Sequence, residues 1–202
     1  MPTHRIAIDP RGFYHIYNRG INSCPLFVEH DNYTHFLRLY DRYVSPIANT
    51  FAWALMGNHF HLLVQILPVE RWGLLNPEGF GNFQGLGADK RISQQFSNLF
   101  NAYTKAFNKR YGRTGSLMEH TFRRKPVTGC TYLKQLMYYI HYNPVRHGMC
   151  KHPVEYAWSS YQTCIAAKPT KLQRDMVIGW FGDGASFRRF HDGNTDLAHI
   201  DE

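Results

Sequence analysis

Two apolar, strand-like runs separated by a Gly-Asn pair constrain the fold of this chain more than any other feature. Residues 50–55 and 59–65 are largely apolar, and Gly57-Asn58 between them is a favourable pair for a hairpin turn. Because successive side chains of a strand point to opposite faces, His59 and His61 share one face, while Phe60 packs on the other. The sequence therefore predicts an antiparallel hairpin with two imidazoles on one face, which can form half of a divalent-metal site.

The order of the remaining elements predicts the fold class. The expected elements are a strand at 13–17, a helix at about 31–44, the hairpin, a helix from about 92, a basic strand at 122–127, and a helix that begins at Thr128 or Thr131 and runs to about Asn143. Strand–helix–strand–strand–helix–strand is a split βαβ arrangement. We therefore expect an α+β fold of the ferredoxin-like or RRM-like type, an antiparallel sheet with helices packed against it.

Composition bounds the domain organisation. With 202 residues, 44% of them hydrophobic, the chain can form one core, and we expect one domain over 1–165 with a C-terminal appendage over 166–202. Two prolines and five glycines predict a long mobile loop at about 68–91. No stretch has the length of a membrane span, and the N-terminus lacks an apolar signal region. The four cysteines have no paired spacing, so we expect reduced thiols in a cytoplasmic protein without a membrane partner.

The net charge of +8 is concentrated in one segment. Residues 105–125 hold seven lysines and arginines but only one acid, Glu119, which gives a local charge of +6, and residues 126–151 contain no acid. A localised excess of this kind favours a polyanion partner, here nucleic acid, over a merely solvated face. The candidate DNA-binding residues are Lys109, Arg110, Arg113, Arg123, Arg124 and Lys125.

The last predicted helix carries a possible complement to the histidine pair. Tyr139 and Asn143 are four residues apart and therefore lie on one helical face. If that face meets the strand, the Asn143 carbonyl can be a third metal ligand and the Tyr139 phenol lies beside the metal. A phenol, with a pKa near ~10, is a weak nucleophile until it is polarised or deprotonated. A divalent ion that also holds a phosphate oxygen would suit attack by tyrosine on a phosphodiester.

Several motifs, in their order, resemble the single-tyrosine HUH transposases and, within them, most closely the REP-associated tyrosine transposases. They are YNRG at 17–20, NHFHLLV at 58–64, YIHYNPVRHG at 139–148 and WSSY at 158–161. The resemblance implies the HUH endonuclease palm, with His59 and His61 as the metal-binding pair, Tyr139 as nucleophile and Asn143 as the further ligand. It also implies Mg²⁺, or Mn²⁺ in its place, and cleavage of single-stranded or hairpin DNA through a 5′-phosphotyrosine. The protein would be associated with the nucleoid and would act as a monomer or a homodimer.

Alternatives remain at this stage. A histidine pair on a strand is more often packed or exposed without a metal than part of a metal site. The neighbouring phenols of Tyr138 and Tyr142 could be mistaken for the nucleophile, and the alignment with Asn143 is what selects Tyr139. A histidine-triad hydrolase would need a third alternating histidine, but position 63 is leucine. The competing function is a catalytically silent module that binds single-stranded DNA or RNA on the same fold.

Overall fold

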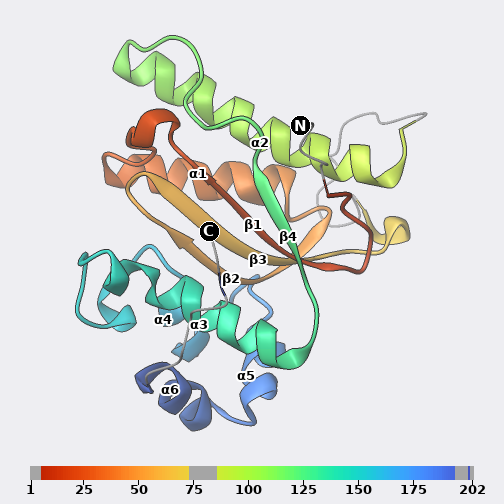
Figure 1. The fold of residues 1–202 in the computed structure, drawn as a ribbon, viewed down its shortest axis with the longest axis vertical. Coiled ribbons are helices and arrows are strands. Elements are labelled where there is room, and N and C mark those ends of the chain that lie inside the picture. The colour runs from red at the N-terminus through yellow and green to blue at the C-terminus, as the bar shows by residue number, and fades with distance from the viewer. Residues whose placement is uncertain (1–5, 73–85, 194–199, 201–202) are drawn as a thin grey trace.

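The computed structural model describes residues 6–72, 86–193 and 200, which contain a four-stranded sheet (Figure 1). The strands are β1 (Phe13–Arg19), β2 (Ala48–Leu55), β3 (His59–Ile66) and β4 (Arg123–Val127). All neighbouring pairs are antiparallel, in the order β2-β3-β1-β4. The predicted α+β class and ferredoxin-like arrangement are therefore confirmed.

Helices cover both faces of this sheet. They are α1 (His30–Tyr43), α2 (Ala88–Tyr111), α3 (Cys130–Arg146), α4 (Tyr161–Ile165), α5 (Arg174–Phe181) and α6 (Gly184–Asp192), with 3-10 turns η1 (Ile21–Ser23), η2 (Val69–Arg71) and η4 (Pro153–Glu155). Figure 1 shows α1 and α2 together on one face, and α3 with the C-terminal helices on the other. None of the helices in the described ranges is long and apolar enough to cross a membrane.

The strand register fixes which side chains face which helical layer. Tyr17 on β1 pairs with His61 on β3, and Arg19 pairs with His59, so these four side chains lie on the α3 side. Phe60 points to the other side, where it is fully buried in a core that includes α1 and α2. A second core joins the other face of the sheet, α3 and the C-terminal helices, and its buried members include Leu63, Leu136, Ile140 and Phe187. The predicted alternation of histidine and apolar faces is therefore confirmed.

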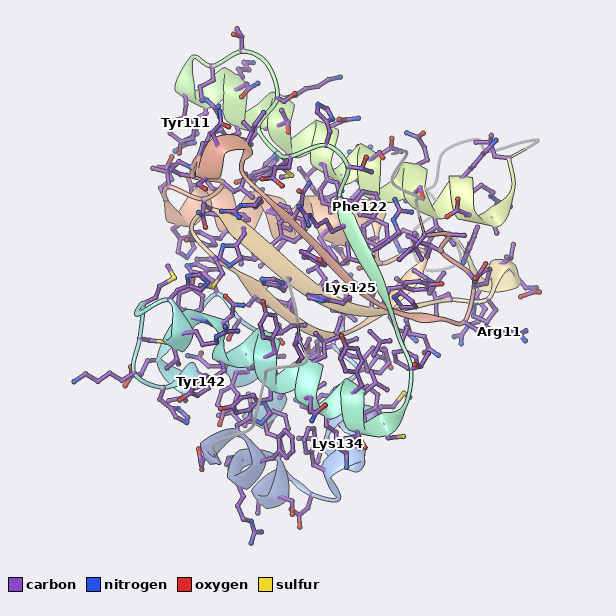
Figure 2. All side chains as sticks on the ribbon, viewed as in Figure 1. Arg11, Tyr111, Phe122, Lys125, Lys134 and Tyr142 are labelled. Carbon is purple, nitrogen blue, oxygen red and sulfur yellow. The ribbon has the colours of Figure 1, made fainter. Side chains whose placement is uncertain are left out.

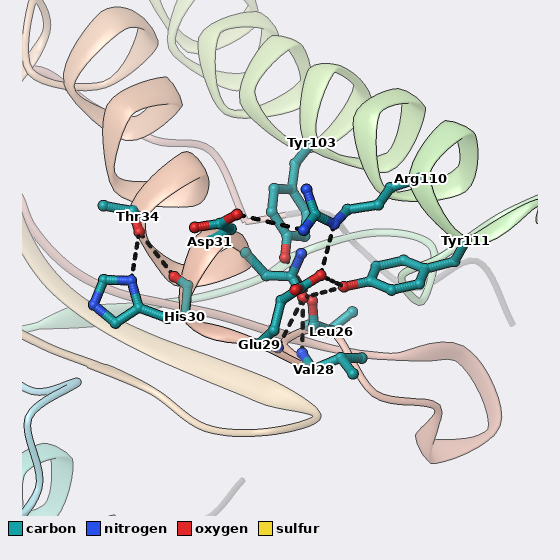
Figure 3. A network of polar contacts seen from close by, with 10 residues as sticks. Leu26, Val28, Glu29, His30, Asp31, Thr34, Tyr103, Arg110 and Tyr111 are labelled. Carbon is teal, nitrogen blue, oxygen red and sulfur yellow. Dashed lines mark hydrogen bonds and ion pairs between the residues drawn. The ribbon is translucent and has the colours of Figure 1, made fainter.

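The helical layer of α1 and α2 is joined at one end by a polar network (Figure 3). Glu29 caps α1 through a capping box with Asn32. Its carboxylate also accepts hydrogen bonds from Arg110 Nε, at 2.6 Å, and from the Tyr111 hydroxyl. Arg110 Nη2 lies 3.4 Å from Asp31 Oδ2. The C-terminal end of α2 is thus fixed to the first turn of α1.

Two element boundaries differ from those predicted. Helix α3 begins after Gly129, at φ +83°, and neither Thr128 nor Thr131 caps it. It also continues past Asn143, through Pro144, to Arg146. Proline has a φ that fits a helix, but it lacks an N–H donor and its ring crowds the carbonyl four residues earlier. Pro144 is in the final turn, so few residues of α3 follow the disturbed hydrogen bond.

The segment predicted as a long loop is shorter at both ends. Val69–Arg71 forms η2, and α2 begins at Ala88 rather than near Ile92. Residues 73–85 lie outside the described residues, so the expected mobility of this segment stays a prediction.

Candidate metal centre and active site

The two histidines of the hairpin form the floor of the candidate site. His59 opens β3 next to the Gly57-Asn58 turn and is partly exposed, whereas His61 is only 2% exposed. Their ring centroids are 5.2 Å apart and the ring planes are nearly perpendicular. Both rings face α3, because they alternate with Phe60, which points into the opposite core.

Helix α3 brings the other two predicted residues onto this floor. Asn143 Oδ1 lies 3.2 Å from His59 Nε2, although the two residues are 84 positions apart in the chain. The Tyr139 ring lies edge-on to His61, with 5.3 Å between the centroids. Tyr139 and Asn143 are both fully buried. The four residues predicted from the sequence as nucleophile and metal ligands therefore lie in one cluster.

The two neighbouring tyrosines face elsewhere. Tyr138 and Tyr142 stack on each other, with centroids 4.9 Å apart. Tyr138 also contacts Phe190 and His191 on α6. Figure 2 shows Tyr142 on α3 toward the C-terminal helices. Tyr139 is thus the one phenol of these three that packs on the histidine pair.

A third histidine, His15 on β1, belongs to the cluster and was missed in the sequence. Its Nε2 lies 2.9 Å from His61 Nδ1, and the two rings are stacked. Burial, with a smaller contribution from the Lys125 charge, lowers the pKa of His15 to about 3, so the ring is neutral at pH 7. Burial likewise moves the pKa of His61 well below its usual value. The sequence signal was the alternation of His15 with Ile16, but its contact with His61 depends on how β1 pairs with β3.

The hydrogen bonds of His59 favour a metal-ligating tautomer. Asn58 Oδ1 accepts a hydrogen bond from His59 Nδ1 at 2.7 Å, which leaves the lone pair on Nε2. Nε2 lies 3.2 Å from the carbonyl oxygen of Asn143, and in this neutral tautomer both atoms are acceptors that a cation can bridge. Octahedral Mg²⁺ with ligand distances of ~2.1 Å places neighbouring ligand atoms about 3 Å apart. The separation of Nε2 and Oδ1 therefore fits two ligands of one ion.

Buried polar atoms without hydrogen bonds gather at the same place. His61 Nε2, His15 Nδ1 and Asn143 Nδ2 are buried and have no hydrogen-bond partner among the described residues. If His61 Nδ1 donates to neutral His15, the Nε2 lone pair of His61 is free to bind a cation. Within the described ranges, no three His, Cys, Asp or Glu side chains group as a metal site. An ion here would therefore rest on two imidazole nitrogens and one amide oxygen, a donor set compatible with Mg²⁺ or Mn²⁺.

Two predicted DNA contacts on β4 lie on the same face as the cluster. Arg123 pairs with Tyr17 and Lys125 pairs with His15 in the sheet. Arg123 is exposed, with Nη2 3.9 Å from Glu119, and the Lys125 ammonium lies 5.9 Å from the Tyr17 ring centre. Figure 2 shows Lys125 over the sheet, above α3.

The other predicted DNA contacts are directed elsewhere. Arg124 points to the opposite face, is 6% exposed, and donates to Ser93 Oγ at 2.9 Å. Arg110 is held by the α1 carboxylates shown in Figure 3. Lys109 is exposed beside it, and the Arg113 guanidinium lies 5.9 Å from the Phe107 ring centre. The basic segment is therefore divided between two faces and is not one surface.

Comparison with known proteins bears on the fold. No protein-family model matches the chain, and no curated protein matches it. Among solved structures, the fold is similar to that of the REP-associated tyrosine transposase bound to a REP hairpin, with a TM-score of 0.63 and 16% sequence identity over 84% of this chain and 89% of that chain. A bacterial tRNA(His) guanylyltransferase-like protein in complex with GTP is more distant, with a TM-score of 0.44 and 9% identity over 72% of this chain and 67% of that chain. The resemblance stated from the motifs is thus confirmed at the level of the fold.

Proposed function

We propose that this protein is a metal-dependent endonuclease and strand transferase that cuts single-stranded DNA, next to a hairpin, through a 5′-phosphotyrosine. The observation that carries the proposal is the packing of Tyr139 and Asn143 of α3 against His59 and His61 of β3. The similar solved transposase is bound to a REP hairpin, which supports hairpin DNA as the substrate.

The proposed site divides the chemistry between a metal and a phenol. His59 Nε2, His61 Nε2 and Asn143 Oδ1 would hold Mg²⁺ or Mn²⁺, which supplies Lewis-acid stabilisation and orients a phosphate oxygen when bound. The Tyr139 oxygen attacks phosphorus and loses its proton, while the bond to the 3′-oxygen breaks and that oxygen gains a proton. The products are a 5′-phosphotyrosine and a free 3′-hydroxyl. Because the adduct conserves the phosphodiester bond, a 3′-hydroxyl can attack it and join strands.

Access to Tyr139 requires a local rearrangement. The Tyr139 side chain has no exposed surface. The guanidinium of Arg146, in the last turn of α3, lies 5.4 Å from the centre of the Tyr139 ring. Arg146 is itself exposed. We propose that an incoming phosphate draws Arg146 off the ring, because guanidinium groups bind phosphate in a bidentate manner.

A covalent-adduct assay tests the function. Wild-type protein incubated with hairpin-bearing single-stranded DNA and Mg²⁺ or Mn²⁺ should give a protein–DNA band that survives denaturing electrophoresis. Tyr139→Phe should give none, because only the phenol oxygen is removed. Tyr142→Phe is the matched control, since its ring lies on the same helix but stacks on Tyr138, and it should retain the band.

Two outcomes would contradict the proposal. A band of equal intensity from Tyr139→Phe would identify another nucleophile. DNA binding by the wild type without any covalent band, with both ions, would favour the silent binding module on the same fold.

A further inference from the structure

A hollow of about 450 Å³ borders the candidate metal centre. It shares His59 with that centre, and its other lining is mostly apolar. The lining includes Phe27, Val28, Met56, Gly57, His147 and Met149. The volume is in the range of small-molecule pockets.

The walls of the hollow are fixed by contacts within the protein. The backbone N–H groups of Leu26 and Phe27 both donate to the Gly57 carbonyl, at 2.8 and 3.0 Å, which joins the loop before α1 to the β2–β3 turn. The Phe27 ring stacks on Tyr33, with centroids 4.7 Å apart. The hollow is therefore formed without a ligand.

Its rim exposes apolar side chains beside an imidazole. Val28 is 58% exposed and Met149 is 46% exposed. His147 packs on His59, with 5.0 Å between their ring centroids. A ligand suited to this rim has a weakly polar body and a group that can reach the metal centre beside His59.

We propose that the hollow binds an unpaired DNA base that belongs to a nucleotide directly next to the phosphate oriented at the metal centre of which His59 is part. This inference rests on the proposed function, because that function puts a phosphate at the metal centre that His59 borders. The faces of a base are apolar and pack on methionine and aliphatic side chains, and thioether sulfur makes favourable contacts with aromatic rings. Packing on a base face is tolerant of sequence, because every base has such a face.

Methionine methyl resonances report on the hollow directly. The chain has six methionines, of which Met56 and Met149 line the hollow and Met176 on α5 does not. Tyr139→Phe protein with ¹³C-methyl methionine is titrated with hairpin DNA that has single-stranded arms on both sides, in Mg²⁺. The Met56 and Met149 signals should shift through the ring current of a base, while Met176 stays in place. The same DNA with abasic arms should bind without these shifts.

An affinity cycle gives a second measurement. Met149→Ala should weaken binding of the intact DNA about fivefold, and binding of the abasic DNA less than twofold. Met176→Ala is the matched control, because its side chain is 47% exposed and lies away from the hollow. It should leave both affinities unchanged.

The outcomes separate this inference from the proposed function. If the wild type forms the covalent adduct but the Met149 signal responds equally to intact and abasic arms, the hollow is not a base site. If the Met149 signal shifts only with intact arms but no adduct forms, the base site stands and the nuclease assignment fails. Absence of any DNA binding overturns both.

Discussion

Helix α3 has a group of buried histidines on each side, and the two groups differ in how their nitrogens are used. On the sheet side lie His15 and His61, and on the side of the C-terminal helices lie His141 and His191. All four are at most 2% exposed, and burial holds their pKa values below the usual range, to about 3 for His15 and about 4 for His191. Burial and neutrality therefore do not distinguish a functional group of histidines from a structural one.

The group next to the C-terminal helices forms a complete chain of hydrogen bonds. His191 Nδ1 donates to the Phe187 carbonyl at 2.9 Å, so His191 Nε2 must accept. His141 Nδ1 donates to it at 3.0 Å, and the Ser160 hydroxyl donates to His141 Nε2 at 2.7 Å. Every ring nitrogen has a partner, which is what a structural network requires.

The group on the sheet side is incomplete. His15 and His61 contact each other, yet His15 Nδ1 and His61 Nε2 find no hydrogen-bond partner in the described part of the chain. An unsatisfied buried nitrogen is costly and calls for an explanation such as an ion. The difference indicates that the unused lone pair of His61 Nε2, more than burial, identifies the candidate site, and the following experiments test that distinction.

Removing the proposed metal ligand His61 should have the largest effect on DNA cleavage and Mn²⁺ binding. We expect His61→Ala to lower the rate of covalent-adduct formation at least ~100-fold and to weaken Mn²⁺ binding, because one of three ligands is lost. Mn²⁺ affinity is measured by electron paramagnetic resonance and adduct formation by denaturing electrophoresis. An adduct rate within tenfold of wild type would show that His61 is no more than a packed side chain.

Removing His15, which would orient His61, should have a smaller effect on metal affinity. His15→Phe deletes the acceptor for His61 Nδ1, and loss of such a partner typically lowers metal affinity about 10–100-fold. His15→Gln offers a carbonyl oxygen at a similar position and should restore part of the affinity. Equal Mn²⁺ affinity in the two variants would contradict an orienting role for His15.

The matched change on the other side of α3 should affect stability instead. His191→Phe leaves His141 Nδ1 without its acceptor, and an unsatisfied buried donor costs about 1–3 kcal/mol of unfolding free energy. Mn²⁺ affinity of the folded protein should be unchanged, because no proposed ligand contacts His191. Urea unfolding and the same resonance titration measure the two quantities. A large loss of Mn²⁺ affinity with unchanged stability would reverse the assignment of the two groups.

How much of this could be read from the sequence depends on the range of the interactions. The hairpin, the shared face of His59 and His61 and the helical alignment of Tyr139 with Asn143 follow from local periodicity, and the structure agrees with each. The contact of His15 with His61 does not follow, because it depends on strand pairing across 46 positions. Non-local register of this kind is invisible to periodicity.

The sequence of the basic segment itself separates two of its charged residues. Arg124 and Lys125 are adjacent on β4, so period-two alternation must send them to opposite faces. Their charge alone would put both on one surface, but Arg124 donates to Ser93 Oγ on α2. The ion pair of Arg110 with Glu29, 81 positions away, could not have been predicted from the local charge pattern around either residue.

The pH dependence of stability provides the finest test of the comparison. His191 has a folded-state pKa of about 4, below the value of ~6.5 expected in the unfolded chain. Between these values the unfolded state binds more protons, so the contribution of His191 is complete above pH ~6.5 and is lost as the pH falls toward 4. Urea unfolding of wild type from pH 7 to pH 5 should therefore show a decrease in unfolding free energy that is about 2 kcal/mol larger than that of His191→Phe. An identical pH dependence in the two proteins would mean that His191 is not buried as a neutral ring. The assignment of His141 and His191 as a structural group, in contrast to His15 and His61, would then be wrong.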